Sequence, residues 1–200
     1  MSWDGPAVAA TGAHYVDCSA AADGTGSAAS PWNTLSSANA HTFGAGDELL
    51  LKRGTQCAGQ QLAPKGSGSA SAPVVIDTYG QGAKPVLAGQ GKVTDVVLLR
   101  NQQHWQINNL DISNTGATAA KRRAVHIVLE DFGTGQSYLL NGLDIHDVNG
   151  DPAKKDDDAS AGIFFEVLGS TTRHTSTTYG SPTTRSVPWT GTASSSGPGG

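Results

Sequence analysis

Two stretches of the chain nearly repeat each other at a spacing of 33 residues. Residues 106–114 read QINNLDISN and residues 139–147 read LLNGLDIHD, so that Asn, Leu, Asp and Ile recur in phase. Self-similarity with a period of about 20–50 residues is typical of solenoids and arrays. Apolar and polar residues alternate within the repeat, as they do in β-strands. We therefore predict an all-β fold, a right-handed parallel β-helix of few coils in which one repeat makes one coil.

Composition limits the domain plan and the classes of partner. A chain of 200 residues favours a single domain, and its net charge of −4 gives no sign of nucleic-acid binding. No apolar run reaches membrane-spanning length. We predict a small, polar leader at 1–13, a β-helix at 14–168, and a Ser/Thr/Gly-rich linker or disordered tail at 169–200. The expected protein is a monomer that binds neither nucleic acid nor membrane.

The stretch 30–35 reads SPWNTL and opens the one good helix candidate of the sequence. Its proline lies near the first turn, where proline is tolerated. Leu35 and Ala38 fall on one side of such a helix. We expect this helix to cover the open N-terminal end of the solenoid, where unpaired strand edges would otherwise invite aggregation.

Strand parity predicts which side chains of the later coils face solvent. In the candidate strand 162–168, alternate apolar residues should point inward, which leaves Phe164 and Glu166 outside. The same reasoning places Arg100 and Glu130 outside, and we expect both to stack with Glu166 on successive rungs of one face. The three are candidate catalytic residues, with carboxylates for acid–base work and a guanidinium for an acidic sugar. The alternative is a cross-strand ion pair beside a solvated glutamate.

Other charged residues supply candidate binding groups. Arg122, Arg123 and His126 are candidate substrate-binding residues, because arginine suits bidentate binding of a sugar carboxylate. Asp147, Asp151 and Glu166 could supply oxygen ligands to calcium, although the acidic loop lacks EF-hand spacing and could simply be a solvated loop. Asp111 and Asp144 also face outward and could bind a cation or stay hydrated. The lone His146 faces outward as well.

The two cysteines, Cys18 and Cys57, make an even count. They could be buried free thiols. The sequence around them is rich in small polar residues and poor in Lys, which favours an extracellular protein and a Cys18–Cys57 disulfide.

Several motifs resemble those of secreted right-handed parallel β-helix proteins of the pectate-lyase-like superfamily. The matching motifs are the Tyr-Val start at 15–16, the SPWNTL helix at 30–35, the Gly-Asp strand and Gly-Thr turn at 46–55, and the strands at 73–76 and 84–87. The superfamily includes bacterial polysaccharide lyases of the alginate lyase and chondroitinase B type. The resemblance implies an N-terminal cap and first coils. In those lyases a Lys or Arg acts as base on a uronate, often with calcium.

These observations favour a secreted, carbohydrate-active β-helix that acts on an acidic polysaccharide. Lyase-like β-elimination is favoured over hydrolysis as its reaction. Calcium is the only cofactor that we expect. Two alternatives remain open: a non-catalytic carbohydrate-binding or adhesion β-helix, and an inactive fragment of a longer enzyme.

Overall fold

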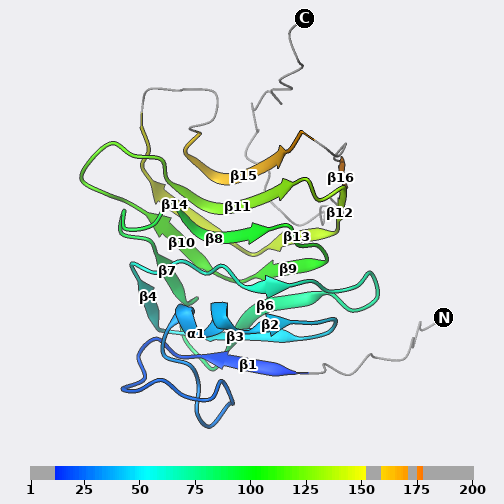
Figure 1. Ribbon diagram of the computed structural model, residues 1–200. Coiled ribbons are helices and arrows are strands. Elements are labelled where there is room, and N and C mark those ends of the chain that lie inside the picture. Colours follow the sequence, from blue (N-terminus) through cyan, green and yellow to red (C-terminus); the bar gives the residue numbers. More distant parts are fainter. Residues whose placement is uncertain (1–11, 152–158, 171–174, 178–200) are drawn as a thin grey trace, which may run out of the picture.

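The computed structural model describes residues 12–151, 159–170 and 175–177. They form a parallel β-solenoid of four coils with one short helix near its N-terminal end (Figure 1). The chain visits three sheets in the same order in successive coils. The predicted all-β, right-handed parallel β-helix is confirmed.

Three sheets make the walls of the solenoid, and every pairing within them is parallel. The first sheet contains β1 (Ala13–Val16), β3 (Glu48–Lys52), β6 (Val74–Tyr79), β9 (Trp105–Asn108) and β13 (Tyr138–Asn141). The second sheet contains β4 (Gln56–Ala58), β7 (Val86–Ala88), β10 (Asp111–Asn114) and β14 (Asp144–Val148). The third sheet contains β8 (Asp95–Arg100), β11 (Arg123–Glu130) and β15 (Ala161–Leu168).

Two short strand pairs complete the set. β2 (Thr42–Phe43) pairs with β5 (Lys65–Gly66), and β12 (Thr134–Gln136) pairs with β16 (Thr175–Thr177). The second pair brings three residues of the predicted 169–200 tail into the solenoid. Most of that tail, and residues 1–11 of the predicted leader, lie outside the described residues. Within the described part, no helix is long and apolar enough to cross a membrane.

The 33-residue repeat corresponds to one coil. Asp111 on β10 pairs in register with Asp144 on β14, and Gln106 on β9 pairs with Leu139 on β13. Equivalent residues of the two repeats therefore lie on neighbouring rungs, about 4.8 Å apart as in any parallel sheet.

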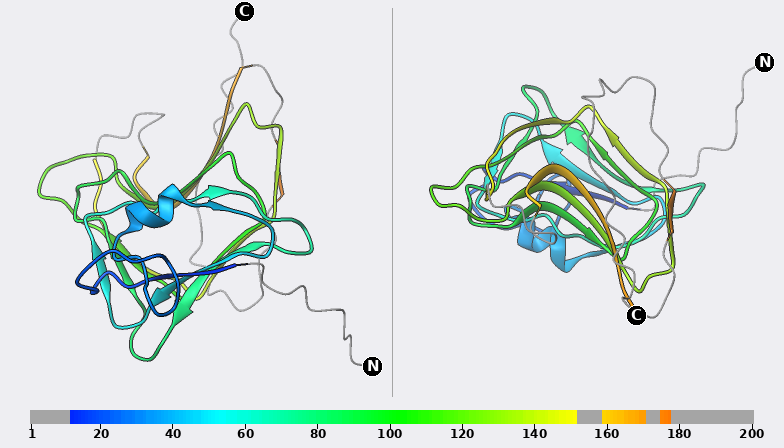
Figure 2. Two further views of the ribbon diagram at one scale, coloured as in Figure 1. Left: turned by 60° about the horizontal axis from the view of Figure 1, so that its bottom comes forward. Right: turned by 90° about the horizontal axis from the view of Figure 1, so that it is seen from above.

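A short helix, α1 (Leu35–Ala40), lies with β1 at the N-terminal end of the solenoid (Figure 2). Thr34 is its N-cap and accepts a hydrogen bond from the Ser37 amide. Leu35 and Ala38 are buried, as the sequence predicted. Asn39 donates to the Gln61 carbonyl and accepts from the Ala63 amide, which fixes the helix to the first coil.

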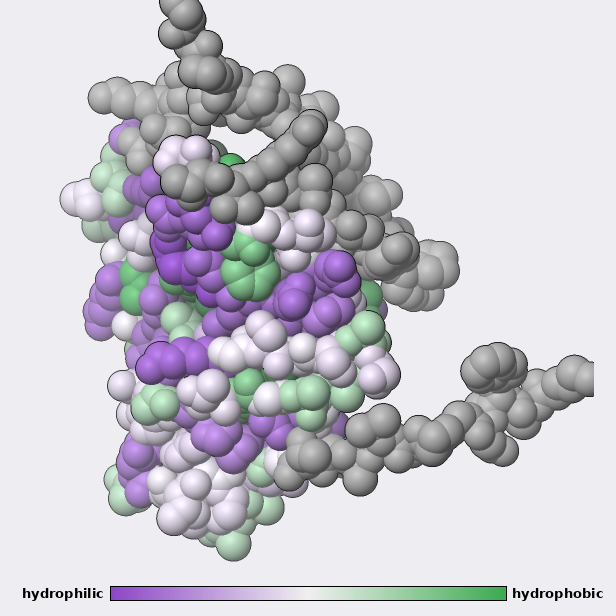
Figure 3. Space-filling view, turned by 45° about the vertical axis from the view of Figure 1, so that its right-hand side comes forward, coloured by the Kyte–Doolittle hydropathy of each residue, from purple (hydrophilic) through white to green (hydrophobic). Residues whose placement is uncertain are grey.

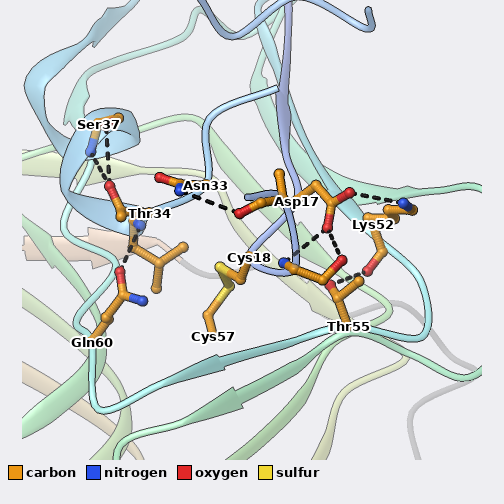
Figure 4. The surroundings of a disulfide bond; sticks show 12 residues. Asp17, Cys18, Asn33, Thr34, Ser37, Lys52, Thr55, Cys57 and Gln60 are labelled. Carbon is orange, nitrogen blue, oxygen red and sulfur yellow. Dashed lines mark hydrogen bonds and ion pairs between the residues drawn. A yellow bond between two sulfur atoms is a disulfide. The ribbon is translucent and has the colours of Figure 1, made fainter. Parts of the chain in front are cut away.

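A disulfide joins Cys18 to Cys57, so the predicted pairing is confirmed. It ties the loop after β1 to β4, with Cα atoms 5.3 Å apart. Figure 4 shows the bridge between the Thr34 cap on one side and the Asp17–Lys52 ion pair, 2.8 Å long, on the other.

The interior of the solenoid is a continuous stack of apolar side chains from all three sheets. Their most buried members, at most 1% exposed, include Leu49, Leu51, Ile76, Leu87, Val97, Leu99, Ile107, Leu110, Ile112, Val125 and Ile127. Asn108 is buried at the bend between the first two sheets, in register with Asn141. The predicted inward direction of the apolar set is confirmed for these rungs.

Strand parity was wrong at Val96 on the third sheet, which the alternation along β8 predicts to face solvent. Val96 is fully buried within the core cluster, because both it and Val97 pack inward where the chain turns into β8. His126 lies on the outer face, as parity predicts, but neighbouring side chains bury it. Val128 is also buried. Conversely, Ile163 and Val167 are 40% and 41% exposed, since β15 belongs to the last described coil.

Candidate functional site

The outer face of the third sheet gathers most of the candidate residues. Parallel register places Val128 between Arg100 on β8 and Glu166 on β15. Glu130 lies two residues further along β11, opposite Leu168. The three catalytic candidates therefore share a face but not a single row, which corrects the expected stacking.

Arg100 and Glu130 form an exposed ion pair at the ends of their strands. The guanidinium Nη1 lies 2.7 Å from the carboxylate Oε2, and the two side chains are 52% and 50% exposed. Asn101 supports Glu130, because its side chain accepts from the Glu130 amide and donates to the Glu130 carbonyl. The strand ends point toward the side of the molecule that Figure 3 brings forward, where the surface is mainly hydrophilic with smaller hydrophobic areas.

A second group on this face centres on His126, whose ring lies between two carboxylates. Its Nε2 is 3.2 Å from Oε2 of Glu166, and its Nδ1 is 3.3 Å from Oδ1 of Asp95. Nη1 of Arg123 lies 2.8 Å from the same Nδ1 and 3.1 Å from the same Asp95 oxygen. The structure thus brings together Arg123, His126 and Glu166 from the predicted set and adds Asp95.

These polar groups are deeply placed for residues of an outer face. The side chains of Arg123 and His126 are 3% and 4% exposed, and that of Glu166 is 18% exposed. Phe164 covers part of the cluster, with its ring centroid 4.6 Å from the Arg123 guanidinium carbon and 5.4 Å from that of the His126 ring. Glu166 is therefore the member of the cluster through which solvent or a ligand reaches it.

Asp95 remains ionised in this setting. Burial acts to raise the pKa of Asp95, but its contacts with His126 and Arg123 outweigh burial, so the pKa lies below its ordinary value. The cluster therefore holds a paired carboxylate at neutral pH.

Arg122 lies apart from this cluster. Its guanidinium donates to the Thr118 carbonyl and to the backbone and side-chain oxygens of Asn149, and it fits against the backbone of Gly91 and Gly116. Arg122 as a whole residue is 2% exposed. Arg122 fastens the loop before β11 to the loop after β14 and does not face outward toward a ligand.

The three calcium candidates are not brought together. Asp147 lies on the second sheet, where its Oδ2 is 2.8 Å from Nδ1 of His146. Glu166 lies on the third sheet and contacts His126. Asp151 is exposed at the edge of the described region. Among the described residues, no group of three or more His, Cys, Asp or Glu side chains could hold a metal ion. The side chains as placed do not fit a calcium site.

The second sheet carries its own charged cluster. Nε2 of His146 lies 2.9 Å from Asp111, and its Nδ1 lies 2.8 Å from Asp147. Hydrogen bonds to Asp147 and Asp111 raise the pKa of His146 above its ordinary value. Asp144 pairs with Lys84 at 2.7 Å. Asp111 and Asp144 thus each have their own cationic or histidine partner on adjacent rungs.

Two solved structures match most of the chain: the native and selenomethionine forms of the GH136 lacto-N-biosidase from Eubacterium ramulus. Each aligns with a TM-score of 0.70 and 26% identity, over 79% and 78% of this chain respectively. The chain spans less than a third of either structure, since the alignment covers 30% of each. No family model and no curated protein matches the chain.

Sequence reasoning missed Asp95, although a signal was present. Asp95 and Arg123 each stand at the first position of a strand whose following residues are largely apolar, reading DVVLLR and RAVHIVLE. Charged residues at equivalent starts of stacked strands become neighbours when the strands pair in register, as Asp95 and Arg123 do. Aligning the strand starts would have predicted this ion pair.

Proposed function

We propose that this chain acts on carbohydrate, in the manner of a glycoside hydrolase, through the outer face of the third sheet. The observation that carries the proposal is the His126 imidazole held between the carboxylates of Asp95 and Glu166. A hydrogen-bonded carboxylate at the edge of a buried polar network is suited to proton transfer. The 26% identity to a lacto-N-biosidase along most of the chain supports the same class of chemistry.

Hydrolysis of a glycosidic bond usually requires two carboxyl groups, one protonated and one ionised. Glu166 and Glu130 are the two that reach solvent on this face. They lie on neighbouring strands and two residues apart in register, so their Cα atoms are about 8 Å apart by strand geometry. Side chains at this spacing can hold their carboxyl groups on either side of a sugar and a water, about 6.5–9.5 Å apart, as inverting enzymes do.

The charges on this face favour an uncharged glycan, in place of the acidic polysaccharide expected from the sequence. Arg123 is buried and already paired, and Arg100 is bound to Glu130. Neither guanidinium is left free to pair with a uronate carboxylate, so this face offers a uronate little attraction. β-Elimination, which acts on uronates, also receives no support from the comparisons.

The remaining expectations carry over as part of the proposal. An extracellular location is consistent with the Cys18–Cys57 disulfide, because such bridges persist in oxidising compartments. We propose a monomer whose partner is the glycan itself. We derive no step through calcium, and activity measured with and without EDTA tests whether the ion is needed.

The test is a panel of neutral and uronate-containing oligosaccharides incubated with the parent protein and with Glu166→Gln. We expect cleavage of a neutral substrate, detected as new reducing ends by mass spectrometry, and a loss of at least about 100-fold in Glu166→Gln. Asp144→Asn, which removes an exposed carboxylate on the second sheet, is the matched control and should keep full activity.

Two results would contradict the proposal. One is a Glu166→Gln variant with parental activity, which would place the chemistry elsewhere. The other is a product with the ultraviolet absorbance of an unsaturated uronate, which would establish a lyase. Binding of a glycan without any cleavage would instead favour the alternative of a carbohydrate-binding β-helix.

A further inference from the structure

We propose that Arg123 and Asp95 are positioning residues that hold His126 neutral, with its proton on Nε2, so that Glu166 is the ionised member of the carboxyl pair. The role given to Glu166 rests on the proposed function, whereas the state of His126 does not. The inference follows from the donors and acceptors within one buried cluster.

The contact between Arg123 and His126 fixes the imidazole tautomer. Nη1 of Arg123 lies 2.8 Å from Nδ1 of His126, which is hydrogen-bonding distance. A guanidinium has only donors and does not lose its proton in proteins. The Nδ1 atom must therefore be the acceptor, which requires a bare lone pair on that nitrogen. A neutral imidazole with a bare Nδ1 carries its proton on Nε2.

The protonated nitrogen faces Glu166. Nε2 lies 3.2 Å from Oε2 of Glu166, so the N–H donates to the carboxylate. A hydrogen bond donated to a carboxylate favours its charged form. Because the tautomer is set on the far side of the ring, His126 presents Glu166 with a donor in a fixed direction. The hydrogen bond thereby orients the Glu166 carboxylate.

Arg123 is itself held by three contacts from the two neighbouring coils. Nη1 lies 3.1 Å from Asp95 on β8, Nε donates to the Ala159 carbonyl at 3.0 Å, and the guanidinium lies over the ring of Phe164 on β15. Its side chain is almost fully buried, so the guanidinium has little freedom to turn away. Asp95 balances the charge of the guanidinium, which would be costly to bury alone.

The assignment gives each carboxyl group a role in hydrolysis. Glu166 accepts a proton from water, and the water oxygen forms the new bond to the anomeric carbon. The bond from that carbon to the leaving oxygen breaks with its electron pair on the oxygen, which takes a proton from Glu130. Glu130 must then be parted from Arg100 when the glycan binds. After the product leaves, Glu166 returns its proton to solvent and Glu130 takes one up, which restores both groups.

The tautomer can be measured without any substrate, by nitrogen NMR of the histidine rings in the full chain at neutral pH. We assign the His126 signals by their loss in His126→Gln. We expect an unprotonated Nδ1 and a protonated Nε2 in the parent protein. Glu166→Leu should keep this tautomer, because Arg123 and not Glu166 determines it. A protonated Nδ1 in the parent protein overturns the proposal.

Variants of the two neighbouring arginines separate positioning from folding. Arg122→Lys and Arg123→Lys alter equally buried guanidiniums, but only Arg123 contacts His126. We expect Arg123→Lys to give a mixture of tautomers, while Arg122→Lys leaves the His126 signals unchanged. An unchanged tautomer in folded Arg123→Lys contradicts the proposal. If Arg123→Lys does not fold, the spectrum of the parent protein and that of Glu166→Leu still decide the question.

Kinetics test the role of Glu166 separately. In Arg123→Lys we expect kcat to fall by up to about 100-fold with little change in KM, because the base is misplaced and the sugar contacts remain. Azide should restore activity to Glu166→Ala, since a small anion can replace a missing base or nucleophile but not a missing acid. Absence of rescue in a folded, glycan-binding Glu166→Ala contradicts the role. If the parent cleaves no glycan, the proposed function fails while the NMR result stands.

Discussion

Removing the Cys18–Cys57 disulfide should cost the fold several kilocalories per mole. The bridge closes a loop between residues 39 apart in the sequence. On the chain-entropy relation, closing a loop of that length lowers the entropy of the unfolded chain. This loss of entropy stabilises the fold by about 3.9 kcal/mol at room temperature. For a domain of this size, the loss corresponds to a fall in Tm of roughly 8–16 °C.

The variant for this measurement is Cys18→Ala/Cys57→Ala, because Cys57 is buried and serine would bury an additional hydroxyl there. Urea unfolding should show a midpoint shift close to the calculated loss. A reducing agent should lower the stability of the parent to nearly the same value and leave the double variant unchanged. Lys84→Met, which removes the partner of the exposed Asp144 on the second sheet, should change stability little and is the control.

A loss below about 1 kcal/mol would refute the reasoning, because it would mean that the reduced chain keeps its first coil and α1 together in the unfolded ensemble. A loss well above the calculated value would instead indicate that the bridge supports the packing of the N-terminal end directly.

Three further predictions concern single side chains. Asn114→Ala should destabilise by roughly 3 kcal/mol in urea unfolding, because the buried amide donates to three backbone carbonyls and accepts from the Gly91 amide, all of which would lose a partner. His146→Gln should lower stability at about pH 5 by about 0.5 kcal/mol or less and have no effect at about pH 9. The raised folded-state pKa of His146 stabilises the fold below the ordinary pKa of histidine, and this stabilisation is lost as pH rises through the raised value. An effect confined to alkaline pH would contradict this sign. Burial raises the pKa of Tyr138 to about 12, so ultraviolet titration should show one late-ionising tyrosine that is absent in Tyr138→Phe.

Much of the fold could be predicted from local patterns because a solenoid repeats its contacts at a fixed spacing. The repeat at 106–114 and 139–147 encodes the length of a coil, and the structure pairs the two segments in register. Leu35 and Ala38 mark the buried side of α1 for the same reason, since local periodicity alone determines which side they share.

The candidate site was harder to predict because it depends on register between strands whose connections differ in length. Parity indicated that Arg100, Glu130 and Glu166 share a face, but the pairing of Val128 with both Arg100 and Glu166 depends on the lengths of the loops between coils. Parity also failed at Val96, where two successive residues pack inward. Neither property is encoded within a single strand.

Two histidines of this protein lie between pairs of carboxylates, and their different neighbours explain why only one is assigned to the site. Both ring nitrogens of His146 face acids, so its protonated form is favoured, and half of the side chain is open to solvent. Nδ1 of His126 accepts a hydrogen bond from the guanidinium of Arg123, so that nitrogen cannot carry a proton. The two arrangements differ by one buried arginine. Without it His146 is a surface imidazolium, and with it His126 is a neutral imidazole that donates in a fixed direction. A cationic His146 neutralises its own carboxylates, whereas a neutral His126 leaves Glu166 charged and partly exposed, which is the property that a catalytic base requires.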